Sequence, residues 1–154
     1  MSYPLTPTDD IITPIIAQLS NVLTTQIGSG IGRTYIEAPD GPPEHQSVIF
    51  PMVKFDIKDD TNGKLYIKLY FNIRYILRRS KLPDDIAQCY LMFSSFIRVL
   101  SSWPNQGLTY NSAGNSITVT PTGGQITQFA IAATPFISLQ VNTEVLTEIN
   151  VLTV

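Results

Sequence analysis

The feature that most constrains this chain is a run of alternating side chains near its centre. Every second position carries a large apolar residue, and these are Leu65, Ile67, Leu69, Phe71, Ile73, Tyr75 and Leu77. The positions between them are largely polar or aromatic, namely Tyr66, Lys68, Tyr70, Asn72, Arg74 and Arg78. Because successive side chains of a strand point to opposite faces, this period of two predicts one long strand with a core-facing side and a polar, aromatic side.

The predicted strand is long for a chain of 154 residues. Its fourteen residues, 64–77, would extend about 46 Å at roughly 3.3 Å each, whereas a compact domain of this size spans only about 38 Å. The turn-forming sequence at 59–63 joins it to the apolar run at 48–57 and predicts an antiparallel hairpin. A hairpin that projects cannot bury its whole apolar side within its own chain, so we expect a neighbouring subunit to cover it.

Two amphipathic helices are expected around this hairpin. Thr8, followed by two aspartates, predicts the start of the first helix, and Gly28 predicts its end. The second helix is predicted over 84–103, directly after Pro83. Its wide apolar stripe should pack across the sheet, with one side formed by Ile86, Tyr90, Phe93, Ile97 and Leu100, widened by Cys89, Phe96 and Val99.

Shorter extended segments are expected elsewhere. Residues 33–38 predict a short strand, and Pro51 within the apolar run predicts an edge position or a bulge there. Residues 104–124 are rich in Gly, Ser, Thr and Asn, which predicts an irregular connection interrupted by a short strand at 117–120.

The C-terminal segment should be extended again from Phe129 onward. Its alternating apolar residues are Ile137, Leu139, Val141 and Val145. The order of helices and strands predicts a single α+β domain over residues 1–154, in which two helices pack on one face of a mainly antiparallel, twisted sheet with a long projecting hairpin.

The composition suits a protein whose surface is partly covered by partners. Charged residues make up 14% of the chain, against about 25% in ordinary soluble domains. The net charge of −2 gives no overall attraction to nucleic acid or to an anionic membrane. The single Cys89 favours a reducing compartment, and no apolar run is long enough for a bilayer span, so we expect a soluble, unexported protein without membrane contact.

No pattern indicates catalysis, a cofactor or a metal site. The glycine-rich sequence at 28–32 follows a predicted helix and lacks the lysine of a phosphate-binding loop, which favours a turn. His45 is the one histidine and is expected on an exposed loop, and the acidic pairs coincide with helix starts and turns. We therefore expect no enzymatic activity.

One basic cluster needs an explanation. Half of the ten basic residues lie on or just after the long strand, between tyrosines, and they are Lys68, Arg74, Arg78, Arg79 and Lys81. The cluster is compatible with a solvated strand face, with ion pairs to a neighbouring subunit, or with contact to DNA phosphates. In a nucleic-acid-binding module, the face of Tyr66, Tyr70, Arg74 and Arg78 would stack on bases and neutralise phosphates.

The layout resembles the tail-terminator proteins of long-tailed bacteriophages. The resemblance rests on the N-terminal helix, the proline-containing strand at 48–57, the long strand at 65–77, the helix at 84–103 and the late strands. It implies a non-enzymatic virion protein, assembled in the host cytoplasm, that forms a hexameric ring on the tail tube, stops its polymerisation and contacts the head connector. A neighbouring neck or tail-completion protein would show the same layout.

The expected assembly surfaces follow from the residues and not from a family motif. Subunit contacts are expected from the hairpin and the last strand, at Tyr66, Lys68, Tyr70, Arg74, Arg78, Arg79, Ile137, Leu139 and Val141. The patch expected to face the next ring or the channel, with incidental contact to packaged DNA, consists of Arg74, Arg78, Arg79 and Lys81.

Overall fold

The structure is a computed structural model that describes residues 10–36, 39–59, 65–102 and 117–149. In chain order its elements are α1 (Ile12–Ile27), β1 (Arg33–Tyr35), β2 (Ser47–Ile49), β3 (Met52–Asp59), β4 (Leu65–Arg78), α2 (Leu82–Leu100), β5 (Ile117–Ile131) and β6 (Thr134–Ile149). The expected α+β class is confirmed.

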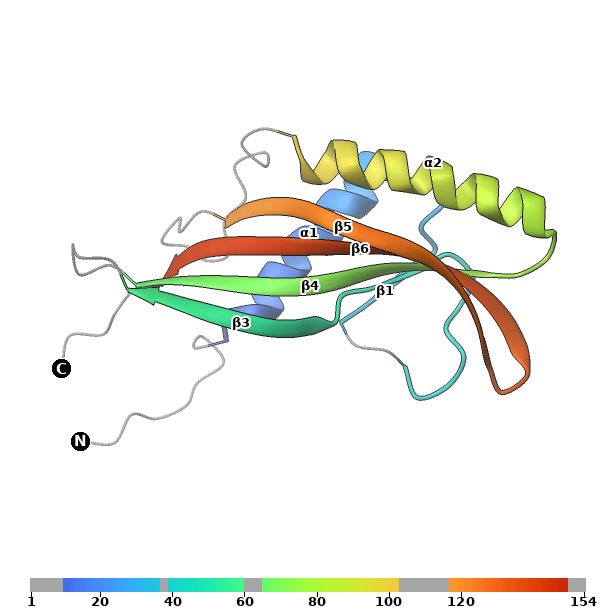
Figure 1. The fold of residues 1–154 in the computed structure, drawn as a ribbon, viewed down its shortest axis with the longest axis horizontal. Helices are drawn as coiled ribbons and strands as arrows, with labels where there is room; N and C mark the ends of the chain where they lie inside the picture. The colour runs from blue at the N-terminus through green and yellow to red at the C-terminus, as the bar shows by residue number, and fades with distance from the viewer. Residues whose placement is uncertain (1–9, 37–38, 60–64, 103–116, 150–154) are drawn as a thin grey trace.

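The strands form one six-stranded sheet in the order β1-β2-β4-β6-β5, with β3 beside β4 (Figure 1). β2 pairs with β4 at 74–76, and β3 pairs with β4 at 65–71, so the two short strands share one edge of β4. β6 pairs with the whole of β4 and separates it from β5. Every pairing is antiparallel except that of β1 with β2.

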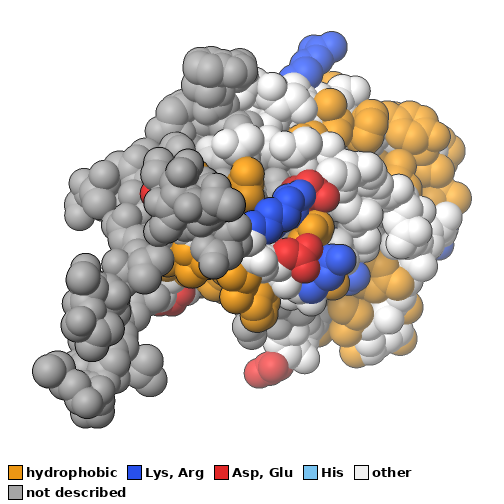
Figure 2. All heavy atoms as spheres, turned by 60° about the vertical axis from the view of Figure 1, so that its left-hand side comes forward, with side chains coloured by type: hydrophobic (Ala, Val, Ile, Leu, Met, Phe, Trp, Pro, Cys, Tyr) orange, Lys and Arg blue, Asp and Glu red, His pale blue; other side chains and the backbone are white. Residues whose placement is uncertain are grey.

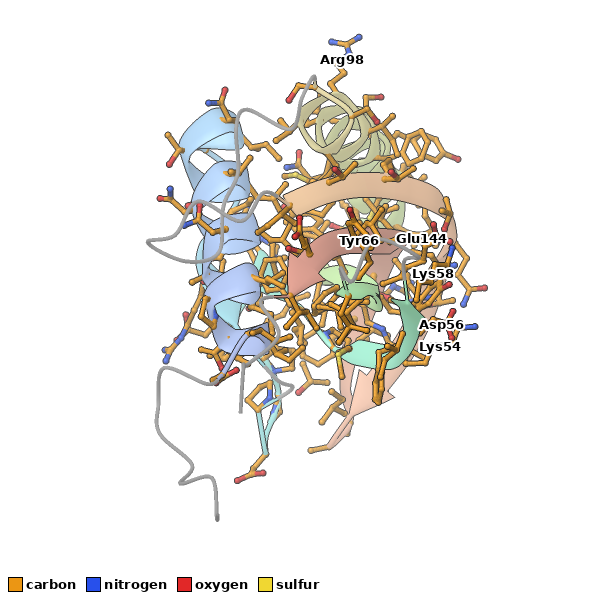
Figure 3. The ribbon with its side chains drawn as sticks, turned by 90° about the vertical axis from the view of Figure 1, so that its left-hand side faces the viewer. Lys54, Asp56, Lys58, Tyr66, Arg98 and Glu144 are labelled. Atoms are coloured by element: carbon orange, nitrogen blue, oxygen red, sulfur yellow. The ribbon has the colours of Figure 1, made fainter. Side chains whose placement is uncertain are left out.

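The long central strand is confirmed almost residue for residue. In β4 the side chains of Ile67, Leu69, Phe71, Ile73, Tyr75 and Leu77 are buried. They share one core with buried residues of both helices, including Leu19 of α1 and Phe96 of α2, so both helices cover the same face of the sheet. Figure 3, which looks along the strands, shows the charged residues Lys54, Asp56 and Glu144 on the other side, called here the open face.

The first helix begins and ends near its predicted limits. The carboxylate Oδ1 of Asp10 accepts the backbone N–H groups of Ile12 and Thr13, both at 3.0 Å. The predicted cap Thr8 lies outside the described residues. Gly28 ends the helix with φ +69°, a conformation that favours glycine, and donates its N–H to Thr24.

The second helix buries only part of the predicted stripe, namely Cys89, Phe96 and Leu100. Its buried side chains are Asp85, Cys89, Met92, Phe96 and Leu100, whereas Tyr90 is 61% exposed and Phe93 48% exposed. The apolar stripe is wider than the surface of the sheet that receives it, so periodicity alone does not select the buried row. The buried carboxylate of Asp85 accepts the N–H of Ser80 and fixes this orientation at the start of the helix. Trp103, the predicted end, lies outside the described residues.

The predicted strand at 117–120 is the start of a longer strand, so the prediction of an irregular connection was wrong for residues 121–124, whereas residues 104–116 lie outside the described residues. β5 runs without interruption over fifteen residues and pairs with β6 throughout, except for a bulge between Pro121 and Gly123. Ala132 and Ala133, with φ of +49° and +67°, form the turn to β6. The end of the β5–β6 hairpin bends away beyond the rest of the sheet (Figure 1), whereas the hairpin predicted to project was that of β3 and β4, whose turn lies outside the described residues.

A small second core forms where this hairpin bends. Ile49, Ile76 and Phe136 are buried there on the side of the sheet opposite the helices, and Phe129 stacks on Phe136 with ring centroids 5.5 Å apart. The burial of Ile76 on the predicted polar side of β4 follows from this packing.

The apolar run at 48–57 is split into two strands, β2 and β3, and the edge position or bulge predicted from Pro51 is found directly after it. The register of β3 against β4 shifts between Met52 and Lys54, and the carbonyl of Pro51 accepts the N–H of Asn72 at 3.0 Å. The turn at 60–64 lies outside the described residues, and the first strand ends earlier than predicted, at Tyr35. Neither helix, within the described residues, is long and apolar enough to cross a bilayer.

Candidate assembly surfaces

The open face of the sheet carries a mixed-charge network contributed by β3, β4 and β6. Tyr70 donates its hydroxyl hydrogen bond to Asp56 at 2.7 Å, and the ammonium of Lys54 lies 4.5 Å from the centre of the Tyr70 ring. Lys68 pairs with Glu144 at 3.5 Å. The hydrogen bond to Asp56 raises the pKa of Tyr70 to about 12. Figure 2 shows basic and acidic side chains interleaved on this side of the molecule.

This network changes the reading of the tyrosine-rich strand. Tyr66, Lys68 and Tyr70 lie on the open face as predicted, but β3 and β6 bring acids beside them. A surface that binds nucleic acid without sequence preference needs a continuous positive groove along the backbone. The network instead alternates charges, which disfavours a nucleic-acid site there.

The rest of the basic cluster lies at the opposite end of β4. Arg74, Arg78, Arg79 and Lys81 are exposed, and none of them belongs to an ion pair within the described residues. The backbone N–H of Arg79 donates to the carbonyl of Pro135 at 3.1 Å, so the cluster lies near the turn of the β5–β6 hairpin. The exposed His45 accepts the N–H of Arg78, which confirms its predicted place on a surface loop.

Three residues predicted for subunit contacts lie inside the protomer. Ile137, Leu139 and Val141 are exposed by 0%, 2% and 1% and belong to the main core. Their strand was predicted only as the last of the chain, without a place in the sheet, and β6 in fact lies between β4 and β5, with its apolar side under the helices. Ile137 and Val141 are therefore not available to a neighbouring subunit, and Leu139 reaches the surface only as part of the floor of a groove described below. Contacts through the exposed residues of the set stay a prediction.

An uncovered apolar row runs along β3. Val53, Phe55 and Ile57 are 57%, 54% and 61% exposed. Phe55 lies opposite Leu69, and Ile57 lies opposite Ile67. Because both partners are buried, Phe55 and Ile57 point to the helix-covered face, although the helices do not cover them. These three residues are called the β3 row below.

A groove of about 520 Å³ lies at the other edge of the sheet, between α2 and β5. Its walls are mostly apolar and include Tyr90, Phe93, Ile97, Pro121, Gly124 and Ile126. At Gly124 a Cβ would overlap the backbone carbonyl of Gln140 on the adjacent strand, so only glycine permits this close approach. This α2–β5 groove was not predicted, because its α2 side chains were expected in the core.

The charge deficit of the chain is concentrated beside this groove. No charged residue occurs between Arg98 and Glu144, a span that contains all of β5 and the first part of β6. β5 pairs only with β6 in the described sheet, so it is an edge strand with no charge. Edge strands usually carry charges that prevent pairing with other chains. This uncharged span was visible in the sequence and could have drawn attention to the hairpin.

The remaining candidates have structural roles. The carbonyl of Gly30, within the glycine-rich sequence, accepts the Tyr75 hydroxyl at 2.8 Å, which fastens this loop to the sheet. Burial raises the pKa of the Cys89 thiol to about 11. Among the described residues there is no group of three or more His, Cys, Asp or Glu that could hold a metal ion.

No family model and no curated protein matches the sequence. Among solved structures, the chain is similar to a chain from the virion of the native gene transfer agent (GTA) particle. The TM-score is 0.58 at 14% identity, and the similarity covers 96% of this chain and 99% of that chain. The two chains therefore share a fold over nearly their whole lengths.

Proposed function

We propose that this chain is a structural protein of a phage-like virion. It forms a hexameric ring at the end of the tail tube, ends polymerisation of the tube and joins it to the head connector. The observation that carries the proposal is the similarity in fold, over nearly the whole of both chains, to a chain of the gene transfer agent virion. The layout of helices and strands that resembles the tail terminators supports the same assignment.

The two uncovered apolar surfaces support a ring. A closed ring of identical subunits uses two different surfaces on every copy, one for each neighbour. The β3 row and the α2–β5 groove are different in shape and lie at opposite edges of the sheet. A symmetric dimer would need only one self-complementary surface.

The top and bottom of the ring contact other virion proteins. The projecting end of the β5–β6 hairpin, which has no charged residue, reaches a tube or connector subunit. The cluster of Arg74, Arg78, Arg79 and Lys81 faces the channel or the next ring, where packaged DNA passes. The function is one of assembly in the host cytoplasm and requires neither catalysis nor a cofactor.

The proposal is tested by measuring the mass of the purified protein by light scattering over a concentration series at two salt concentrations, alone and with tail tubes. We expect six subunits per particle, either in solution or on tube ends, and tubes that stop growing once capped. A protein that stays monomeric with tubes and leaves their growth unchanged would refute the terminator role. Rings that form without capping tubes would point to another neck protein. A titration with single-stranded DNA tests the alternative of a nucleic-acid-binding module.

A further inference from the structure

The two edges of the antiparallel part of the sheet are suited to pairing. Within the described sheet, β3 pairs only with β4, and β5 pairs only with β6, so each has one edge without a strand beside it. β5 has no charged residue, and the apolar side of β3 is more than half exposed. Unpaired edges with these properties are templates for a strand from another chain.

The strand directions fit a head-to-tail contact. β3, β4, β6 and β5 lie side by side in this order, and each runs antiparallel to the next. The two outer strands, β3 and β5, therefore run in opposite directions. In a ring, neighbouring copies have nearly the same orientation, so β5 of one copy would meet β3 of the next as an antiparallel pair. The alternation of directions would continue from copy to copy.

The two faces match as well. A sheet that continues into the next copy keeps its helix-covered face on the same side. The β3 row points to that face, and Ile126 in the groove points to it too, because it lies opposite the buried Leu139. On the open face, Lys54, Asp56 and Lys58 would meet the threonines and glutamines of β5, so no like charges come together.

We propose that each copy adds its β3 strand to the β5 edge of the next copy, so that the β3 row covers the α2–β5 groove and one antiparallel sheet continues around the ring. The proposal rests on the proposed function, since it names the contact that would close the ring. It assigns the subunit interface to residues at the sheet edges.

The test uses three substitutions of exposed apolar residues. Phe55→Lys alters the β3 row, Phe93→Lys alters the groove, and Leu91→Lys is a matched control, because Leu91 is 62% exposed on α2 but does not line the groove. Circular dichroism and thermal midpoints first establish that all three variants fold like the wild type. We expect the first two to lose the ring at concentrations where the wild type and Leu91→Lys are fully assembled.

A mixture of the two defective variants provides the sharper test. The Phe55→Lys copy keeps an intact groove, and the Phe93→Lys copy keeps an intact β3 row. Each should be monomeric alone, whereas together they should form a one-to-one dimer that cannot extend. If the wild type assembles only on tail tubes, capping of the tubes replaces ring formation in solution as the readout for the single variants.

The outcomes separate this inference from the proposed function. Rings or capped tubes from Phe55→Lys as abundant as from Leu91→Lys would overturn the β3–β5 contact and leave the terminator role intact. The contact would also be overturned if mixing the Phe55→Lys variant with the Phe93→Lys variant gave no heterodimers. The same holds if the Phe93→Lys variant alone formed dimers through β3. A wild type that neither assembles nor caps tubes would instead refute the proposed function.

Discussion

Removing the hydroxyl group of Tyr75 should destabilise the fold without disturbing its packing. Tyr75 is fully buried on β4, and its hydroxyl donates to the carbonyl of Gly30 at 2.8 Å. Its ring lies edge-on to Phe96, with centroids 6.2 Å apart. The Tyr75→Phe substitution keeps the ring contact and removes the hydrogen bond to the loop after α1, together with the longer one, at 3.4 Å, that the hydroxyl accepts from the Gln88 amide.

The loss of stability depends on the Gly30 carbonyl, which the substitution leaves without its donor. A hydrogen bond contributes a net of about 1 kcal/mol, and a buried acceptor left without a donor costs about 1–3 kcal/mol. Because Gly30 is only half-buried, water can partly replace the hydroxyl, so we expect a loss of about 1.5 kcal/mol in the free energy of unfolding. For a domain of this size that corresponds to a fall of about 3–6 °C in Tm.

Urea and thermal unfolding, followed by circular dichroism, measure this loss. Tyr90→Phe is the matched control, because Tyr90 is 61% exposed and its hydroxyl is expected to contribute little. A Tyr75→Phe variant as stable as Tyr90→Phe would refute the reasoning.

The same substitution should change the alkaline limit of stability. Burial raises the pKa of Tyr75 above its ordinary value of 10.0. The unfolded chain therefore loses this proton first, and stability falls as the pH rises above about 10. Tyr75→Phe should reduce the steepness of that fall relative to the wild type, and an unchanged slope would contradict the assignment.

Three further predictions concern single sites. Gly124→Ala should lower the free energy of unfolding by about 2–3 kcal/mol, because the added Cβ overlaps the backbone of β6. The control Gly41→Ala, with open space around the added Cβ, should change it by less than about 0.5 kcal/mol. Equal unfolding midpoints of the two variants in urea would contradict the close approach at Gly124. The buried Cys89, whose pKa is raised to about 11, should react with a thiol reagent at neutral pH only after denaturant is added, and rapid labelling of the native protein would show that it is accessible. Asp56→Asn should lower the pKa of Tyr70 from about 12 toward its ordinary 10.0, measured by ultraviolet titration, and an unchanged value would exclude the hydrogen bond as the cause.

The elements that sequence reasoning predicted well have local causes. The alternation of β4 is strict because one face lies entirely in the core, and a shift by one residue would expose every apolar side chain. Gly28 ends α1 because its positive φ suits glycine. Pro51 interrupts the sheet because it cannot donate to a strand ladder. Each signal lies within a few residues of its effect.

The errors arose where neighbours distant in sequence decide the outcome. The composition rich in Gly, Ser, Thr and Asn up to residue 124 indicated a loop, but an edge strand accommodates Pro121 and Gly123 through a bulge. The alternation of β6 was recognised, yet no local signal showed that β5 would lie outside it and that Leu139 would be buried. The basic cluster was seen without Asp56 and Glu144, the acids that only the sheet brings to Tyr70 and Lys68.

The low charge content of the chain has a structural location, and that location bears on assembly. A soluble monomer protects its sheet edges with charges or covers them. Here the open face carries a mixed-charge network that includes the Lys68–Glu144 ion pair, while the stretch between Arg98 and Glu144, including the β5 edge, has no charge. Such an edge invites uncontrolled pairing unless a specific partner fills it. A ring in which β5 receives the β3 strand of the next copy would leave neither of these described edges open, and it would explain why β5 carries no charge while β3 leaves its apolar row exposed.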